Sequence, residues 1–500
     1  MSEHRPRIAI IGAGPGGISL ALSLKQKGVH DFVVYERESG IGGVWYQNRY
    51  PGYRCDIDAL YYSHSRYPYN FGESHPPRKV VQEYWDSICF KEDLHSQFHS
   101  NTTLKSASWD PSDSTYKLIL ENRDGTEVKV NHQYLISAIG SFSSPSRANI
   151  PGLQDFEGEI IRSWSWPEEL GLAELRGKRV AVLGNGCTGT QLITVLSRDP
   201  EIEVIAISRS VRWLKPGTTK EGPHTVKWSK VQSFLYSIAP FRWVARLGVF
   251  LTMETYWIGF AKKSILTPIV RKAQNRVARW MSTSAPEKLR EKIVPDYPVG
   301  SNRITFDGGY LNALNQPNVT AVLDAVQQVK GSSLILQSGQ EFQADCIVLA
   351  TGFDTAASLN VQGREGHLMA GKRDHLEYYH GIAIPGFHNV FSLQGNNSTA
   401  GHFSSLFQIE VQAEYIASLL AKTGQQDAKV IEVKESSTKE YNEWIDRRLD
   451  KTVWSGKESW YRADGGKGRI FTHWPGPATL YWWINRKINW DDWVITGANP

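Results

Sequence analysis

The feature that most constrains the fold is a unit of strand, glycine-rich turn, helix and second strand, which occurs twice. In the first copy, an apolar run at residues 8–11 precedes the turn GAGPGG at 12–17, a predicted helix over 18–26 and a second apolar run at 32–35. The turn has the spacing GxGxxG, and Glu36 follows it by about 20 residues. This order is typical of a parallel βαβ unit that holds a dinucleotide, whereas a glycine turn alone would be a weak signal.

Each position in the first turn has a physical role. Gly12 permits the tight turn, Gly14 lets the backbone approach a pyrophosphate, and Gly17 lets the helix pack closely on the strand. The start of the helix offers free N–H groups and positive potential to phosphates. Glu36 can accept hydrogen bonds from ribose hydroxyls and would repel a 2′-phosphate. The residues predicted to line this first site are Gly12, Gly14, Pro15, Gly16, Gly17 and Glu36.

The second copy differs from the first at the end of its second strand. It consists of a strand at 179–183, the turn GNGCTG at 184–189, a helix over 190–197 and a strand at 204–207. Arg209 stands where the first copy has its acid, and a cation there can pair with a 2′-phosphate, although a solvated surface charge is the alternative. Two unlike turns favour two unlike nucleotides, and FAD with NADPH is the economical pair. The residues predicted to line this second site are Gly184, Asn185, Gly186, Cys187, Thr188, Gly189, Thr190 and Arg209.

The remaining pattern predicts an α/β protein with two Rossmann-like dinucleotide-binding domains and a helical insert in the second one. Two further strands end in turns, at 134–140 and 346–354. They are similar to the segments where flavoproteins that bind two dinucleotides cross between domains. We predict an FAD domain from residues 1–150 and 354–500, an NADP domain from 151–217 and 297–353, and a helical insert at 218–296. Residues 156–167 join the two units, either as a segment that senses one nucleotide or as a surface loop.

Composition narrows the function further. A net charge of +5 spread over 500 residues is too weak to indicate nucleic-acid binding. The four cysteines form no CxxC pair, which disfavours a dithiol centre and zinc, and the histidine spacing indicates no metal site. Reduced thiols and a polar start without a signal peptide predict a cytoplasmic protein. The apolar stretch 234–270 is interrupted by charges, so a buried helical subdomain is favoured over a helix on a membrane surface.

Two further loops carry residues suited to a flavin site. The stretch 42–56 reads GGVWYQNRYPGYRCD, and the stretch 297–303 reads YPVGSNR. With both glycine turns, the turn ATGFD at 350–354 and the tail motif around 459–476, the chain resembles a type I Baeyer–Villiger monooxygenase, a class B flavoprotein monooxygenase, along nearly its whole length.

The resemblance implies a reaction. NADPH would reduce FAD, O2 would add to give a flavin peroxide, and this species would attack the carbonyl of a ketone to give an ester or lactone. Aromatic residues in the insert and the tail favour a bulky ketone. Heteroatom oxidation, hydroxylation or epoxidation by the same cofactor is the alternative, and a reductase or oxidase that does not oxygenate is a further one.

The resemblance also implies roles for particular residues. Arg303 would stabilise anionic intermediates and Asp56 would orient it, while a structural salt bridge is the alternative for this pair. Trp45 and Tyr62 match flavin-contacting positions, and Ser210 joins Arg209 at the phosphate of NADP. The other predicted cofactor contacts are Gly43, Val44, Arg54, Cys55, Leu104, Asn302 and Asn396.

The sequence departs from the family pattern at two positions. The fingerprint FxGxxxHxxxWP is present at 156–167, but Arg162 replaces its histidine, and arginine is always charged. We therefore predict that Arg162 contacts the backbone or acids near the second turn and supports the geometry of a hinge. Asn302 stands where the family often has a lysine that helps to hold the 2′-phosphate.

Overall fold

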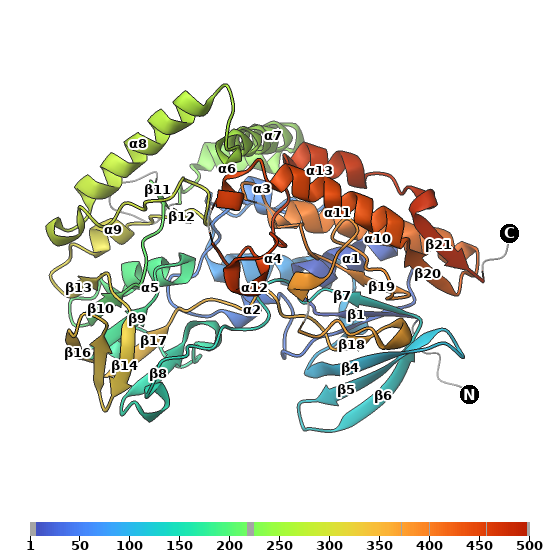
Figure 1. The fold of residues 1–500 in the computed structure, drawn as a ribbon, viewed down its shortest axis with the longest axis horizontal. Helices are drawn as coiled ribbons and strands as arrows, with labels where there is room; N and C mark the ends of the chain where they lie inside the picture. Colours follow the sequence, from blue (N-terminus) through green and yellow to red (C-terminus); the bar gives the residue numbers. More distant parts are fainter. Residues whose placement is uncertain (1–6, 218–224, 372, 400, 457, 498–500) are drawn as a thin grey trace.

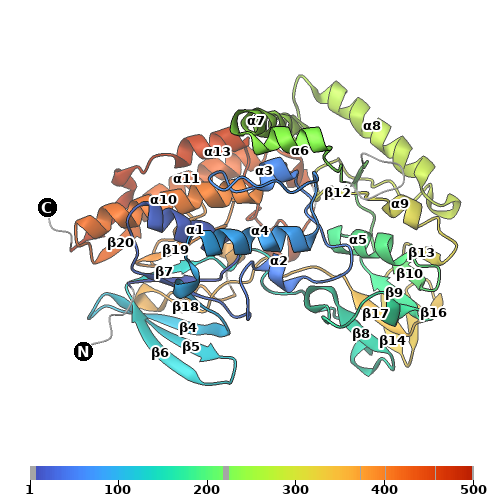
Figure 2. The same cartoon turned by 180° about the vertical axis from the view of Figure 1, so that it is seen from behind.

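The structure, a computed structural model, describes residues 7–217, 225–371, 373–399, 401–456 and 458–497. Two parallel sheets lie in separate halves of the molecule, with helices above and around them (Figures 1 and 2). The predicted fold class is confirmed. The predicted domain limits stay a prediction, and residues 218–224 at the start of the expected insert lie outside the described residues.

The first sheet has five parallel strands in the order β19-β7-β1-β2-β3. These are β1 Ile8–Ile11, β2 Phe32–Tyr35, β3 Phe98–His99, β7 Tyr134–Ser137 and β19 Val390–Ser392. Every residue of β1 and β2 is buried, as expected for parallel strands covered on both faces. Helix α1 (Pro15–Gln26) begins three residues before the predicted start because proline is well suited to the first helical position.

The second sheet also has five parallel strands, in the order β13-β10-β9-β17-β8. These are β8 Glu159–Arg162, β9 Arg179–Leu183, β10 Glu203–Ile207, β13 Val319–Val322 and β17 Cys346–Leu349. Helix α5 (Cys187–Leu196) follows β9 and starts within the glycine turn. The joining segment 156–167 is therefore not only a loop, because its centre forms the edge strand β8 beside β17.

Smaller sheets and short elements complete the two halves. A four-stranded sheet holds β4 Thr102–Asp110, β5 Thr115–Asn122, β6 Glu127–His132 and β18 Val361–Gln362, and a three-stranded sheet holds β14 Val326–Lys330, β15 Ser333–Leu336 and β16 Glu341–Gln343. The two-stranded sheets are β11 Leu214–Lys215 with β12 Thr305–Phe306, and β20 Val430–Val433 with β21 Trp493–Thr496. The remaining helices outside the insert are α2 Val44–Gln47, α3 Ala59–Tyr62, α4 Arg78–Lys91, α9 Tyr310–Ala313, α10 Ser405–Gln425, α11 Glu435–Leu449, α12 Ala463–Gly466 and α13 Ala478–Asn485.

In the described part of the insert, residues 225–296, the α-helices are α6 (Lys230–Ser237), α7 (Ala239–Tyr256) and α8 (Thr267–Ser284). The expectation of a buried helical subdomain is wrong, because neither α6 nor α7 contains a buried residue. Among the described helices, none alone is long and apolar enough to cross a membrane. The pair 230–237 and 239–260 reaches that length and composition together, but with a bend of 103° at the break.

Candidate functional site

The first glycine turn is shaped by close backbone contacts that exclude larger residues. Gly12 has φ +108°, and a Cβ there would lie 2.8 Å from the carbonyl oxygen of Ala138. A Cβ on Gly17 would lie 2.0 Å from the carbonyl oxygen of Gly12. Gly43, with φ +57°, lies in the loop before α2 and close to the first turn. A Cβ added to Gly43 would lie 2.9 Å from Cα of Gly14. The turn after β1 and the GGVW loop therefore meet over the start of α1.

Glu36 ends β2 beside this turn. Its side chain is buried, and its two carboxylate oxygens accept hydrogen bonds from the backbone N–H groups of Ala13 (2.7 Å) and Glu38 (2.9 Å). Burial raises the pKa of Glu36, and the two backbone hydrogen bonds oppose that rise. The carboxyl group is thus fixed in place next to the first turn.

The second glycine turn repeats this geometry with an open space above it. Gly184 has φ +117°, and a Cβ there would lie 2.5 Å from the carbonyl oxygen of Ala350. A Cβ added to Gly186, in contrast, would meet no heavy atom within 4 Å. The side-chain amide of Asn185 donates to the carbonyl oxygen of Ser210 at 2.8 Å, which ties the turn to the segment after β10. In that segment Arg209 is exposed.

Asp56 and Arg303 are brought together from loops far apart in the sequence. A guanidinium N–H of Arg303 donates to a carboxylate oxygen of Asp56. Both side chains are partly accessible to solvent, 41% for Arg303 and 30% for Asp56. Burial alone would raise the pKa of Asp56, but the charge and hydrogen bond of Arg303 hold it below the usual value. The same interaction raises the pKa of Arg303, so both groups are ionised.

Trp45 and Tyr62 are neighbours in the structure, and their contact with a flavin stays a prediction. The indole N–H of Trp45 donates to the hydroxyl oxygen of Tyr62, and the two rings meet edge to face with centroids 5.6 Å apart. Tyr53 stacks on Trp45 at 4.8 Å with an angle of 14° between the rings. The sequence analysis did not single out Tyr53, although it lies in the same aromatic loop.

The C-terminal tail contributes residues around Arg303 that sequence reasoning missed. The charge of Arg303 acts to lower the pKa of Tyr461 and of His473. The ring centroids of Tyr461 and His473 lie 3.9 Å apart. Burial, assisted by Arg303, lowers the pKa of His473 to about 3, so this imidazole is neutral near pH 7. Trp454 donates its indole N–H to the carbonyl oxygen of Gly300 at 2.9 Å and so holds the loop that carries Arg303. The tail motif at 459–476 was the available signal.

Several predicted contacts have other partners in the protein. Arg54 pairs with Glu73 at 3.3 Å, and Asn396 is buried with its amide donating to the carbonyl oxygens of Arg373 and Leu376. Cys55 is buried, which raises the pKa of its thiol. Contacts of these residues with a cofactor stay predictions, as do those of Leu104 in β4, Val44 in α2, and Asn302.

Arg162 occupies the last position of β8, opposite Leu349 in β17. Its side chain is exposed, and within the described part of the chain it has no hydrogen bond or ion pair. The predicted contact with the backbone or acids near the second turn is therefore not made in this conformation. A role for Arg162 in a hinge stays a prediction.

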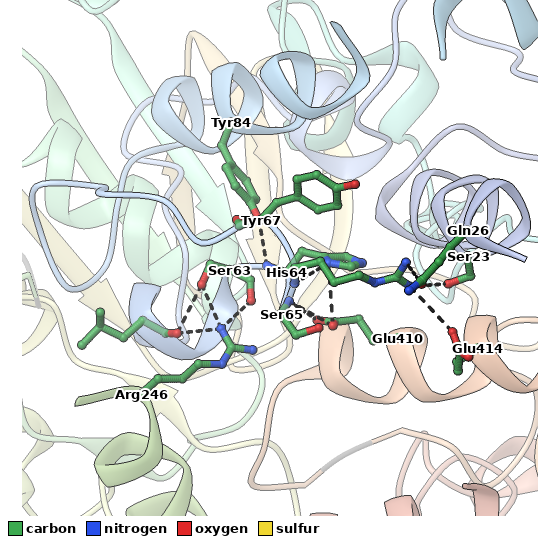
Figure 3. A network of polar contacts seen from close by, with 12 residues as sticks. Ser23, Gln26, Ser63, His64, Ser65, Tyr67, Tyr84, Arg246, Glu410 and Glu414 are labelled. Atoms are coloured by element: carbon green, nitrogen blue, oxygen red, sulfur yellow. Dashed lines mark hydrogen bonds and ion pairs between the residues drawn. The ribbon is translucent and has the colours of Figure 1, made fainter. Parts of the chain in front are cut away.

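His64, close to Tyr62 in sequence, belongs to a structural network (Figure 3). It is buried, and burial together with Arg66 and Arg246 lowers its pKa to about 3. Its Nδ1 accepts a hydrogen bond from the backbone N–H of Arg66 at 3.3 Å and lies 3.8 Å from a carboxylate oxygen of Glu410 in α10. The network joins the segment after α3 to α10.

Comparison with known proteins places the chain in a family. A family model described as pyridine nucleotide-disulphide oxidoreductase matches residues 6–222. A Baeyer–Villiger monooxygenase of Pseudomonas aeruginosa is 30% identical over 508 aligned positions, which cover 98% of this chain and 91% of that protein. The chain belongs to the Baeyer–Villiger monooxygenase family. The four cysteines of this family member are free.

Solved monooxygenase structures share the fold along the whole chain. A steroid monooxygenase bound to NADP superposes with a TM-score of 0.82 at 22% identity and covers 98% of this chain and 99% of its own. A cyclohexanone monooxygenase from Rhodococcus sp. Phi1 bound to NADP+ gives 0.83 at 22% identity, with 98% of each chain covered. The chain therefore shares the overall fold of these monooxygenases over nearly its whole length.

Proposed function

We propose that the protein is an NADPH- and O2-dependent FAD monooxygenase that inserts an oxygen atom into a bulky ketone to give an ester or lactone. The observation that carries this proposal is the ionised Asp56–Arg303 pair, which joins the stretch 42–56 to the stretch 297–303 and stays partly accessible to solvent. Membership of the Baeyer–Villiger family supports it independently.

The first unit fits FAD. The backbones of Gly14 and Gly43 approach each other at the start of α1, where free N–H groups favour a pyrophosphate. Glu36 is fixed by Ala13 and Glu38 and keeps lone pairs for ribose hydroxyls. The residues that would hold FAD are Gly12, Gly14, Pro15, Gly16, Gly17, Glu36, Gly43, Val44, Trp45, Arg54, Cys55, Asp56, Tyr62, Leu104 and Asn396.

The second unit fits NADPH. The space above Gly186 would admit a pyrophosphate to the start of α5, and the exposed guanidinium of Arg209 would pair with the 2′-phosphate. The residues that would hold NADPH are Gly184, Asn185, Gly186, Cys187, Thr188, Gly189, Thr190, Arg209, Ser210, Asn302 and Arg303.

When bound, FAD would supply the redox chemistry, the activation of O2 with electrons from NADPH, so that one oxygen atom would enter the substrate and the other would leave as water. Arg303 stabilises the negative charge that develops on the carbonyl oxygen of the ketone, because its guanidinium is fully charged and held in place before reaction. Asp56 orients that guanidinium. His473 beside it is neutral and Tyr461 is protonated, so neither adds a competing charge.

The bulky substrate is supported by the aromatic residues near the loop of Arg303. A Cβ on Gly300 would lie 2.9 Å from the ring of Phe260, and Phe260 packs on Trp454 with centroids 5.1 Å apart. This loop is therefore bounded by the insert and the tail together, and large apolar rings suit such surroundings.

Product analysis tests the proposal. The holoenzyme, NADPH and O2 are incubated with a polycyclic ketone, with cyclohexanone and with a thioether, and esters, lactones and sulfoxides are quantified. We expect ester from the polycyclic ketone, loss of ester in Arg303→Ala, and ester retained in the control Arg209→Ala at saturating NADPH. Ester formation that survives Arg303→Ala would contradict the role of Arg303. A wild-type enzyme that gives sulfoxide but no ester from any ketone would favour heteroatom oxidation.

A further inference from the structure

Helices α6 and α7 present an apolar face to the outside of the molecule. Across these two helices, no residue is buried. Large apolar side chains on them are instead exposed, namely Phe234 (66%), Phe241 (54%), Trp243 (62%), Val244 (63%) and Leu251 (54%). Isolated exposed apolar residues are common, but a contiguous group of this size on neighbouring turns marks an interaction surface.

Two charged side chains of α7, Arg246 and Glu254, instead bond to the rest of the protein. Arg246 donates to the backbone carbonyl oxygens of Leu60 (2.8 Å) and Ser63 (2.6 Å) beneath the helix (Figure 3). Glu254 accepts hydrogen bonds from the backbone N–H groups of Ala478 (2.7 Å) and Thr479 (3.1 Å) at the start of α13. A helix facing water has the opposite arrangement, with charges outside and apolar residues inside.

The apolar face continues onto neighbouring elements. Helix α13 lies beside α7 in both views (Figures 1 and 2). It exposes Trp482 (47%) and Trp483 (59%). At the other side, the segment leading into α8 exposes Ile265 (95%), and the first turn of α8 exposes Ile269 (65%). We call the exposed surface of α6, α7, α13 and residues 265–269 the apolar face.

Basic side chains adjoin the apolar face. Helix α8 carries four bases and no acid, and the bases are all exposed: Arg271, Lys272, Arg276 and Arg279. Lys262 and Lys263, also exposed, lie between α7 and α8. Exposed aromatic and aliphatic residues next to bases are the combination that binds the interface of an anionic membrane, where rings enter the headgroup region and bases meet phosphates.

We propose that the apolar face docks on the surface of a membrane that carries anionic lipid headgroups, without crossing it. The bend of 103° between α6 and α7 suits helices that lie along an interface rather than one that spans it. Charge favours a lipid surface over a second copy of this chain, because a symmetric contact between two copies would place the bases of one α8 near those of the other.

Vesicle flotation of the holoenzyme tests the proposal without reference to turnover. Vesicles are made either of phosphatidylcholine alone or of phosphatidylcholine with about 30% phosphatidylglycerol, at low salt and at about 0.5 M NaCl. We expect flotation with the anionic vesicles, little with phosphatidylcholine alone, and a marked reduction at high salt. Wild-type protein that remains in the dense fraction with both vesicles would overturn the proposal.

Variants locate the binding surface. The combined variant Phe241→Ser, Trp243→Ser and Leu251→Ser should reduce flotation at least about tenfold, because three exposed apolar side chains no longer enter the lipid. The matched control is Phe90→Ser on α4, which is 81% exposed and lies outside the apolar face, and it should float like wild type.

A second combined variant, Arg271→Glu with Arg276→Glu, should lose the preference for anionic vesicles. All variants are compared by bound FAD, far-UV circular dichroism and light scattering. Unchanged flotation of the first variant would refute the docking surface. A fall in molecular mass of that variant, without any vesicle binding by wild type, would assign the apolar face to self-association instead.

Discussion

The substitution Asp56→Asn isolates the contribution of the charge that holds Arg303. Asparagine keeps the size of the side chain and one acceptor oxygen, but it removes the negative charge that pairs with the guanidinium. A hydrogen bond between charged groups contributes roughly 1.5–3 kcal/mol, and the lower end applies here because 41% of the Arg303 side chain is accessible to solvent. A loss of about 1.4 kcal/mol corresponds to a tenfold slower step.

The assay separates the two halves of the reaction. Anaerobic stopped-flow absorbance measures reduction of the flavin by NADPH, and ester formation measures oxygen transfer. We expect Asp56→Asn to slow ester formation about tenfold and to change flavin reduction less than about twofold. The control Glu73→Gln neutralises the partner of Arg54, another ion pair close by, and should leave ester formation near wild type.

The pH dependence supplies an independent check. Because Arg303 lowers the pKa of Asp56, the ion pair is complete above the ordinary carboxyl pKa of 3.8 and is lost only as pH falls through the lower pKa of the folded protein. The rate of wild-type ester formation should therefore show no decrease from protonation of Asp56 between about pH 5 and 8.

Wild-type rates of oxygen transfer in Asp56→Asn would refute the role of the Asp56 charge in holding Arg303.

Three other substitutions have defined outcomes. In steady-state assays, Arg209→Ala should raise KM for NADPH about tenfold, because a charge-assisted hydrogen bond to the 2′-phosphate is lost, and should leave KM for NADH unchanged. Equal effects on the two KM values would contradict a 2′-phosphate contact. Asp58 caps α3 by accepting a hydrogen bond from the backbone N–H of Leu60, and burial raises its pKa to about 6. The folded protein therefore loses stability as pH rises from about 4 to 6 and this carboxyl ionises. Asp58→Asn should raise the melting temperature at pH 8 but not at pH 4, and an equal change at both values would rule this out. Arg162→His should retain flavin binding and activity; loss of oxygen transfer with intact flavin reduction would place Arg162 in the active site.

The sequence predicted the two parallel sheets and their glycine turns because these depend on local order. Gly12 and Gly17 are each required by contacts within one turn or with the adjacent strand, and such contacts leave a pattern over a short stretch. The Asp56–Arg303 contact was predicted from family resemblance alone, since no local rule joins loops so far apart.

Long-range packing explains what the sequence did not predict. Tyr461 and His473 reach Arg303 only after the chain has returned to the first half of the molecule, so no spacing rule connects them. The apolar composition of α7 suggested burial, but Arg246 and Glu254 turn inward to Ser63 and Ala478. Periodicity does not reveal which face of a helix a neighbour covers.

Oxygen labelling tests the central claim most directly. The holoenzyme is given NADPH, a polycyclic ketone and 18O2, and the product is analysed by mass spectrometry together with the NADPH consumed. The account predicts an ester or lactone with one 18O atom per molecule, formed in step with NADPH oxidation and dependent on Arg303. NADPH oxidation that yields only hydrogen peroxide, with no labelled ester from any ketone, would contradict it.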